Sequence, residues 1–491
     1  MITTALGASS PPQMNAINYL IANAAPGHET IPRGFTSDFF EVYSPPIRSR
    51  YAGVVWRVLD PVPLPPSIVS LYNGTAMSVT GFEVDVIRKV ADGKDASVPN
   101  YQSYNHHFTA HLHGAGARLS ANAVGTPNIR HRVPFERTDL APSSVPHLQA
   151  FNEHNGNEAR QTYHGLPSGF VQPLFSPVSF VFNPMQINLL NPDGSGTRGG
   201  PLPRSSAAPT DAKYSGLLEC PCTTRIHKDL NKSTINGRYF NPHCTADKER
   251  SDLLANHNPT CSVATYVGGM ECCKDEMVLL DADQLQPDYT DEIYFKWRFY
   301  HEAFNVKKHT PIIHLEWAVN GCDSGGPRGN PNNCPHIEYD VVKAIPGTPP
   351  SKTVHTVTSH FQVRDMLAKD CDPIMDEYCA SEKVAMERGG KLRLIMAGGH
   401  CHSPACISLE LWNRDTAELI CRITPVLGKG DKVFDEAGYL FLPPCQWGEE
   451  EGLISPPVLD LDANLTTIKR ANNTEYHYGV MGIWQMRGAY M

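Results

Sequence analysis

Proline occurs so often along this chain that long helices have little room to form. It occupies 41 of the 491 positions, well above the roughly 5% that is usual in globular proteins. Because proline lacks a backbone N–H and its ring clashes with the preceding helical turn, it kinks or ends a helix. The distribution therefore favours short strands joined by irregular loops.

Short apolar or alternating runs, separated by turn residues, recur along the chain in the manner of a β-sandwich. They cover residues 51–60, 66–72, 80–90, 104–114, 177–190, 291–301, 310–321, 336–342, 391–402, 405–413, 417–427, 438–447 and 474–486. Residues 361–388, charged and interrupted only by Pro373, are the best helical candidate. We predict an all-β fold of two jelly-roll β-sandwich domains with long Cys-rich loops.

The predicted domain boundaries follow changes in composition. Residues 1–32 are small, polar and proline-containing, and we expect an N-terminal arm there. Residues 33–305 would form the first β-sandwich domain, with a Cys-rich insertion at about 191–276, and residues 306–491 would form the second.

The distribution of cysteine indicates an oxidising compartment. All 14 cysteines lie between Cys220 and Cys445. Several stand in close pairs within loops, namely Cys220/Cys222, Cys272/Cys273, Cys322/Cys334, Cys371/Cys379 and Cys401/Cys406. Such pairs favour disulfides in a secreted chain. The alternative is a zinc site formed by Cys220 and Cys222 with Cys272 and Cys273. Asn-x-Ser/Thr triplets, the acceptors of N-glycosylation, begin at Asn73, Asn231, Asn464 and Asn472.

The opening residues lack the charged start of a signal peptide. We expect that peptide to be absent from this numbering and the protein to be secreted or extracellular. The net charge of −9 argues against nucleic-acid binding. The chain contains no apolar run of the roughly 18 residues that a membrane span requires, and no GxSxG, GxxxxGK[ST] or strand-borne GxGxxG. Hydrolase, kinase and dinucleotide-binding functions therefore have no support.

The sharpest chemical pattern is His400-Cys401-His402. On a strand, alternate residues share a face, so the two imidazoles can converge on one ion while Cys401 points the other way, available for a disulfide. A third ligand is needed, and either His477 or Met481 on a later strand could provide it. Two nitrogens with a thioether suit copper better than zinc, although methionine more often fills a core.

A second group of histidines lies in the run from 105 to 113. Either the histidines of one strand face bind a metal, or the adjacent pair His106 and His107 does so through a local twist. The alternative is that His106 is a hydrogen-bonded core residue and the others are solvated. In a regular strand, one face would carry His107, Thr109, His111 and His113, and the other His106, Phe108, Ala110 and Leu112. His164, in a Gly/Pro-rich segment, is more simply a loop residue.

With an early His-His strand, a later His-x-His strand and a methionine strand near the C-terminus, the chain resembles the ascorbate-dependent copper monooxygenases. This group contains the peptidylglycine α-hydroxylating and dopamine β-monooxygenases. An even closer likeness is to the plant stress-upregulated nodulin family, over roughly residues 33–490. The segments that carry it are VPNYQSYNHHF (98–108), YVGGMECCKDEM (266–277), PHIEYDVV (335–342), DEAGYLFLPPCQW (435–447) and EYHYGVMGIWQM (475–486).

The resemblance implies two jelly-roll domains with a copper ion in each, facing one another across a solvent cleft. It assigns His400, His402 and Met481 to the oxygen-binding copper. It assigns His106 and His107 to the electron-supplying copper.

Two departures from the monooxygenase pattern bear on that assignment. Asn188 stands where the third histidine of the electron-supplying site is expected, and an amide is a poor copper ligand; His111, His113 or His164 would have to replace it, or this site is empty. Gly398 and Gln485 replace the arginine and tyrosine that hold a peptide carboxylate in the amidating enzyme. A peptidylglycine substrate is therefore not expected.

We predict a secreted, copper-binding, monooxygenase-like glycoprotein with one or two copper ions. As an enzyme it would hydroxylate a C–H bond of an unknown small-molecule or peptide substrate, using O₂ and ascorbate as reductant. The alternative is a non-catalytic structural or interaction glycoprotein of an extracellular protein assembly, built on the same scaffold.

Overall fold

The computed structural model describes residues 38–90, 94–127, 133–139, 143–153, 164–191, 275–280, 285–319, 339–341, 344–402, 405–427, 440–449, 453–474 and 477–491. Strands dominate these residues, and their only α-helices are the short α1 and α4. No helix among them is long and apolar enough to cross a membrane. The predicted all-β sandwich fold is confirmed. The predicted N-terminal arm and residues 192–274 of the insertion lie outside the described residues.

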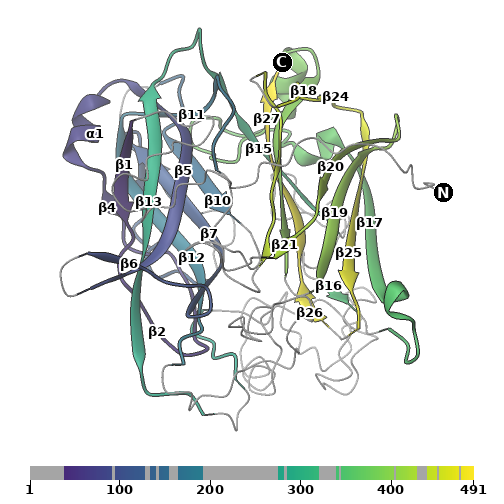
Figure 1. Ribbon diagram of the computed structural model, residues 1–491. Helices are drawn as coiled ribbons and strands as arrows, with labels where there is room; N and C mark the ends of the chain where they lie inside the picture. The colour runs from purple at the N-terminus through teal and green to yellow at the C-terminus, as the bar shows by residue number, and fades with distance from the viewer. Residues whose placement is uncertain are drawn as a thin grey trace.

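Two sheets built from the first half of the chain pack face to face, and we call this pair the first sandwich (Figure 1). One sheet has the order β1-β13-β5-β11-β14, with β2 and β6 at its margins, and the other has the order β10-β7-β12-β3, with β4 beside β12. Phe108 and Trp297, one from each sheet, meet in an aromatic core with ring centroids 4.7 Å apart.

The elements of this half are β1 (Phe39–Tyr43), β2 (Ile47–Arg50), β3 (Val54–Trp56), β4 (Val62–Pro63), α1 (Pro66–Leu71), β5 (Ala76–Lys89), β6 (Asp95–Ser97), β7 (Ser103–Gly114), β8 (Ala117–Leu119), β9 (Phe135–Arg137), β10 (Leu148–Glu153), β11 (Phe170–Phe175), β12 (Pro177–Asn188), β13 (Thr290–Ala303) and β14 (Thr310–Pro311). Strands β8 and β9 form a separate two-stranded ribbon.

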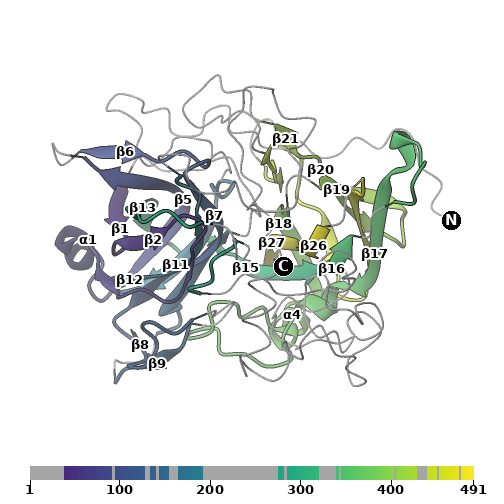
Figure 2. The same ribbon diagram turned by 90° about the horizontal axis from the view of Figure 1, so that it is seen from below.

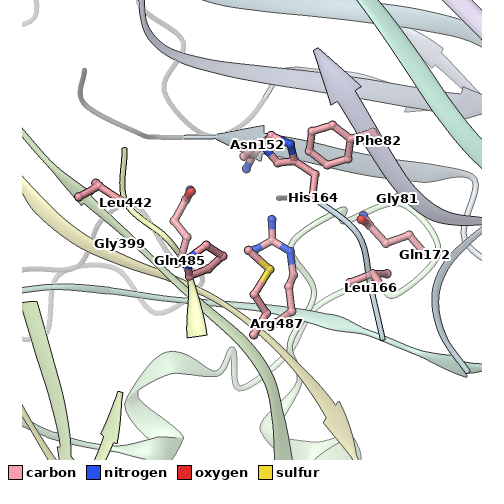
Figure 3. A pocket seen from close by; sticks show the side chains of 13 residues that line it. Gly81, Phe82, Asn152, His164, Leu166, Gln172, Gly399, Leu442, Gln485 and Arg487 are labelled. Carbon is pink, nitrogen blue, oxygen red and sulfur yellow. The ribbon is translucent and has the colours of Figure 1, made fainter. Parts of the chain in front are cut away.

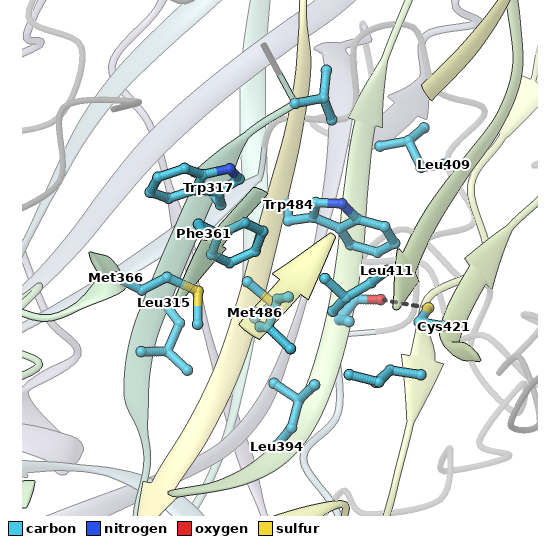
Figure 4. Packing of buried hydrophobic residues seen from close by; sticks show 14 of the residues in the cluster. Leu315, Trp317, Phe361, Met366, Leu394, Leu409, Leu411, Cys421, Trp484 and Met486 are labelled. Atoms are coloured by element: carbon cyan, nitrogen blue, oxygen red, sulfur yellow. Dashed lines mark hydrogen bonds between the residues drawn. The ribbon is translucent and has the colours of Figure 1, made fainter. Parts of the chain in front are cut away.

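The second half forms another pair of sheets, the second sandwich. Its sheets have the orders β15-β27-β18-β23, with β24 beside β18, and β17-β25-β19-β20. Trp317, Trp484 and Met486 of the first of these sheets pack into the core between the two (Figure 4). The core face of β27 therefore carries Trp484 and Met486, and the residues between them, such as Gln485, face outward.

The elements of this half are β15 (Ile313–Ala318), β16 (Tyr339–Val341), η2 (Pro350–Lys352), β17 (Val354–Gln362), η3 (Val363–Met366), α4 (Glu382–Glu387), β18 (Lys391–Cys401), β19 (Cys406–Asn413), β20 (Glu418–Ile423), β21 (Val426–Leu427), β22 (Leu440–Phe441), β23 (Cys445–Gln446), β24 (Val458–Asp460), β25 (Asn464–Asn472), β26 (His477–Val480) and β27 (Gly482–Tyr490). Strands β16 and β26 form one two-stranded sheet, and β21 and β22 form another.

Two predicted elements are wrong in type. Residues 66–72, expected as a strand, form α1, because prolines at the start of the run suit the first turn of a helix. Residues 361–388, expected as a helix, keep only η3 and α4 at their ends. Pro373 and a disulfide between Cys371 and Cys379 hold the middle as a compact loop instead.

The two sandwiches lie side by side, with sheet β10-β7-β12-β3 of one turned toward sheet β15-β27-β18-β23 of the other (Figures 1 and 2). The chain passes from the first to the second between β14 and β15, because β14 still pairs with β11. Polar groups bridge the contact: Gln446 of β23 donates a hydrogen bond of 2.6 Å to the carbonyl of Gly165. The division into two domains near residue 305 stays a prediction.

All six cysteines in the described residues form disulfides. The predicted pairs Cys371–Cys379 and Cys401–Cys406 are confirmed. The third, Cys421–Cys445, links β20 to β23 and so ties the two sheets of the second sandwich together. The other predicted pairs lie outside the described residues.

Removing the disulfide between the sheets should destabilise the second sandwich. Cys421 and Cys445 are fully buried and 24 residues apart, so their bond restricts the unfolded chain by about 3 kcal/mol in the chain-entropy model. We expect the double variant Cys421→Ala/Cys445→Ala to lower the free energy of unfolding by about that amount, measured by urea denaturation. An unchanged denaturation midpoint would contradict this role.

Candidate functional site

Strand β7 carries the first group of candidate histidines and has a bulge at His106. Two consecutive residues of β12 pair with Asn105 and His107, so His106 is the extra residue that a bulge inserts. A bulge bends its strand and re-aims a side chain. His106 therefore points toward the second sandwich, and not into the aromatic core where a regular strand would have placed it.

The end of β18 presents the other two candidate histidines, His400 and His402. Between them, Cys401 points into the core of the second sandwich and forms its disulfide with Cys406, as predicted. The backbone N–H of Cys406 also donates to the carbonyl of His402, at 3.1 Å. This small ring fixes the backbone at His402 while the imidazoles face the first sandwich.

The rings of His106, His400 and His402 form one cluster between the sandwiches. The ring centroids of His106 and His402 are 4.9 Å apart, and those of His400 and His402 are 5.0 Å apart. The centroids of His106 and His400 are 5.9 Å apart. The three side chains are at most 1% exposed. Residues far apart in the sequence thus meet in a buried histidine cluster.

This arrangement differs from the two separate copper positions that the resemblance implies. There, His106 and His107 belong to one ion, and His400 and His402 to another across a cleft. Here the His106 ring lies against the second pair. The His107 ring is 5.4 Å from that of His106 and packs edge-on against Trp56, with centroids 5.0 Å apart.

Asn188, the residue in the expected histidine position, has a structural role at the end of β12. Its Nδ2 donates to the carbonyl oxygen of Ser49 at 2.9 Å, and its Oδ1 accepts from the backbone N–H of Leu190 at 2.8 Å. The Asn188 amide thus links β12 to β2, and both its nitrogen and its oxygen already form hydrogen bonds.

Met481 lies between β26 and β27, next to the histidine cluster along the sheet. The β18–β27 ladder ends with Cys401 opposite Gly482, so His402 and Met481 are the next residues beyond that pair. The Met481 side chain is 8% exposed and packs with Ala318 and Ile483. The side chain of His477, the other predicted third ligand, lies outside the described residues.

The spacing of the histidine cluster suits a shared metal ion. Imidazole nitrogens bind a metal ion such as zinc at about 2.0–2.1 Å. Imidazole rings that share one ion in this way have ring centroids roughly 5 Å apart. No group of three His, Cys, Asp or Glu residues in the described part of the chain is already set to hold a metal. The rings would have to turn about χ2, for which histidine has broad freedom. Three imidazoles with a nearby thioether are a donor set that fits copper.

The remaining candidate histidines lie in other environments. The Nε2 atom of His111 is 3.2 Å from Oε1 of Glu377. Burial lowers the pKa of His113, whose ring contacts a backbone carbonyl. His164 stacks on Phe82 with centroids 4.3 Å apart. His107, His111 and His113, which one face of β7 was expected to carry, therefore do not surround a single metal position.

A loop that sequence reasoning missed holds the sandwiches together. It is the disulfide-closed segment 371–379, which we call the clamp loop. Its polar contacts with the first half of the chain join Glu377 to His111 and the Asn152 amide to the Tyr378 hydroxyl. The His147 N–H also donates to the Ile374 carbonyl at 2.9 Å, and Arg137 pairs with Asp372. The available signal was a close cysteine pair around polar residues, which we interpreted as part of a helix.

Tyr378 of the clamp loop and His314 of β15 are both buried, with ring centroids 5.5 Å apart. Burial raises the pKa of Tyr378 well above its usual value, and the charges of Glu377 and Glu316 add to this. Burial also lowers the pKa of His314 well below its usual value, and the Arg487 guanidinium lowers it further. Tyr378 and His314 therefore stay neutral at physiological pH.

A buried lysine positions the backbone at Met481. The Nζ atom of Lys469, a residue only 1% exposed, donates to the Met481 carbonyl at 2.7 Å. Because a buried carbonyl without its donor costs about 1–3 kcal/mol, this bond fixes the turn between β26 and β27.

The variant Lys469→Met should lower the free energy of unfolding by about 1–3 kcal/mol. Methionine keeps much of the side-chain volume but cannot donate to Met481. Urea denaturation measures the effect, and Lys391→Met is the matched control. Lys391 forms only an exposed pair with Asp460, so its loss should change stability by less than about 0.5 kcal/mol. Equal effects of the two substitutions would refute the role of Lys469.

Comparison with known proteins gives one finding. The family model described as Stress up-regulated Nod 19 matches residues 216–489. No curated protein matches the chain. The matched range contains His400, His402 and Met481 but not His106. It therefore covers only those histidines of the cluster that the second sandwich contributes.

Proposed function

The chain belongs to the stress up-regulated Nod 19 family, and on that premise we propose that it is a copper-binding protein with one ion between its two sandwiches. His106, His400 and His402 would be the ligands, with the thioether of Met481 as a further donor. The likeness to the ascorbate-dependent copper monooxygenases is part of this proposal and lies beyond the family match.

One observation carries the proposal, namely the three buried imidazoles with centroids 4.9 to 5.9 Å apart. A single buried histidine is usually a core residue with a hydrogen bond. Burying three together removes many polar ring atoms from water, which costs free energy unless other interactions offset it. A metal ion between the three rings could bind one nitrogen of each.

Copper at this position would supply one-electron chemistry toward O₂, with ascorbate as the reductant. The chain would hold the ligand rings from two sides, fix the His402 backbone through the Cys401–Cys406 ring, and exclude bulk water. Hydroxylation of a C–H bond in a small-molecule or peptide substrate is the activity class that we propose. Each turnover would consume two electrons from ascorbate and two protons, with one oxygen atom entering the product and the other leaving as water.

We propose one ion and not two because the second set of ligands is otherwise engaged. The Asn188 amide bonds to Ser49 and to the Leu190 backbone, and His107 packs against Trp56. These contacts favour the second candidate function as well. A scaffold without an electron-supplying site fits a non-catalytic extracellular structural or interaction protein.

Copper counting on the purified chain, by elemental analysis after copper loading, tests the proposal. We expect one ion per chain, lost in His106→Ala and in His402→Ala because each removes a ligand. His107→Ala should keep the ion. His360→Ala is the matched control, since His360 lies on β17 and bonds to Thr466 at 2.8 Å.

Two outcomes would contradict the single shared site. Retention of copper in His106→Ala, with loss in His402→Ala, would place the ion within the second sandwich alone. If the folded wild-type chain binds no copper, the copper proposal is wrong and the non-catalytic function is supported instead. Circular dichroism of each variant separates ligand loss from unfolding.

We further propose that the protein resides outside the cell or in an oxidising lumen. The three disulfides support this, since such bonds persist in oxidising compartments. Among the sequons, Asn73 is exposed in the turn after α1. The Asn464 amide instead donates to Asp415 at 2.9 Å, and Asn231 lies outside the described residues.

Expression through a eukaryotic secretory pathway should therefore give glycosylation at Asn73. The variant Asn73→Gln should remove one mass step that is sensitive to an N-glycosidase, and Asn464→Gln should leave that step in place. Mass spectrometry of the intact chain measures both, and an unchanged mass in Asn73→Gln would exclude this site.

A further inference from the structure

His314 lies where three parts of the molecule meet. Its neighbours on β15, Ile313 and Leu315, point into the core of the second sandwich, so the His314 ring points toward the first. There its Nε2 atom is 3.4 Å from the Nε2 atom of Gln172 on β11. The ring also packs edge-on against Tyr378 of the clamp loop, with centroids 5.5 Å apart. One buried imidazole thus contacts both sandwiches and the loop that links them.

The polar surroundings of this ring suit the neutral imidazole. The Gln172 amide nitrogen donates to the Ala150 carbonyl at 2.9 Å, so it is a donor and His314 Nε2 meets it as an acceptor. The neutral ring then has its proton on Nδ1, which is buried and without a hydrogen-bond partner among the described residues. A second proton, on Nε2, would set an N–H against the amide NH₂ group. Both N–H groups of the imidazolium would then lack acceptors, which is costly in a buried site.

Two basic groups on neighbouring strands also oppose a charge on His314. Arg487 lies directly opposite it in the β15–β27 ladder, and like charges in that position repel. His111 approaches from β7 of the first sandwich. Burial lowers the pKa of His314 well below its usual value, and Arg487 and then His111 lower it further. The ring therefore stays neutral while the sandwiches are in contact.

The acidic groups around His314 do not reverse this effect, because they have other partners. Glu316, on the same face of β15, accepts a hydrogen bond of 3.1 Å from the Gln485 amide. Glu377 of the clamp loop lies 3.2 Å from the Nε2 atom of His111.

A small pocket provides space for water next to this group. Gln172 of the first sandwich and Arg487 of the second line it, together with Asn152 and Gln485 (Figure 3). Its volume is about 50 Å³, which is room for a few water molecules. Protons can therefore come close to His314 without unfolding of either sandwich.

We propose that His314 is an acid-sensitive latch between the two sandwiches. Protonation of its ring opposes the contact with Gln172 and sets a second cation opposite Arg487. The clamp loop then releases the first sandwich, and water surrounds the new charge. The latch uses none of the three clustered histidines, so it stands or falls separately from copper binding.

The contact should loosen as the pH falls below about 6.5, the usual pKa of histidine. His314 is neutral in the closed form and titrates freely in the open form, so opening takes up a proton. Closure is therefore most favourable above that pH and weakens below it. One such proton raises the opening equilibrium constant about tenfold between pH 7.5 and pH 5.5.

Hydrogen–deuterium exchange of the purified chain in the presence of a metal chelator tests the latch at these two pH values. Exchange is followed by mass spectrometry and corrected for the intrinsic rate at each pH. The His147 amide reports directly, because it donates to the Ile374 carbonyl of the clamp loop at 2.9 Å. Its opening constant should rise at least about tenfold at the lower pH, while the β19–β25 ladder stays protected.

His314→Gln should remove most of this pH dependence, because glutamine cannot gain a proton in this range. His355→Gln is the matched control and should keep the dependence. Burial lowers the pKa of His355 as well, but this residue lies on β17, in the other sheet of the second sandwich.

Arg487→Gln is a second test, which keeps His314 in place. Without the opposing cation the closed form accepts the proton more readily, so the difference between the two pH values should shrink. The proposal is wrong if wild-type exchange at His147 is independent of pH, or if both variants keep the wild-type dependence. Equal loss of protection in the β19–β25 ladder would also refute it, because acid would then unfold the whole chain.

Discussion

The structure depends on one buried contact, in which the outer face of sheet β10-β7-β12-β3 meets the outer face of sheet β15-β27-β18-β23. Outer faces of sandwich sheets usually face water and carry polar side chains. When two such faces are buried against each other, their polar groups must find partners inside the protein. His111 with Glu377 and Gln446 with Gly165 meet this need. The histidine cluster and the pocket occupy the same buried layer.

Local irregularities in the strands create the candidate site within this buried layer. The bulge at His106 turns one imidazole out of the first sandwich, and Gly398 leaves space where the sheet would otherwise present a side chain. The clamp loop, closed by its own disulfide, then links the two sandwiches through its polar contacts. Metal binding, as proposed, requires that fixed arrangement.

Sequence patterns predicted the parts of the fold whose causes are local. The alternation in His400-Cys401-His402 indicated two outward imidazoles and an inward disulfide cysteine, and the Cys401–Cys406 bond is confirmed. Alternation also placed Phe108 in a core. The prediction of residues 361–388 as a helix was wrong because a charged run with one proline resembles a solvated helix. Instead, polar residues of this segment such as Glu377 contact the first sandwich.

The sequence by itself determined an all-β chain, the alternation of its strands and two of its disulfides, because these follow from the period of two in a strand and from short loop closure. It also indicated the family. Only the tertiary structure decided that His106 joins His400 and His402. A bulge and the docking of two sheets set these positions, and both depend on contacts between residues far apart in the chain.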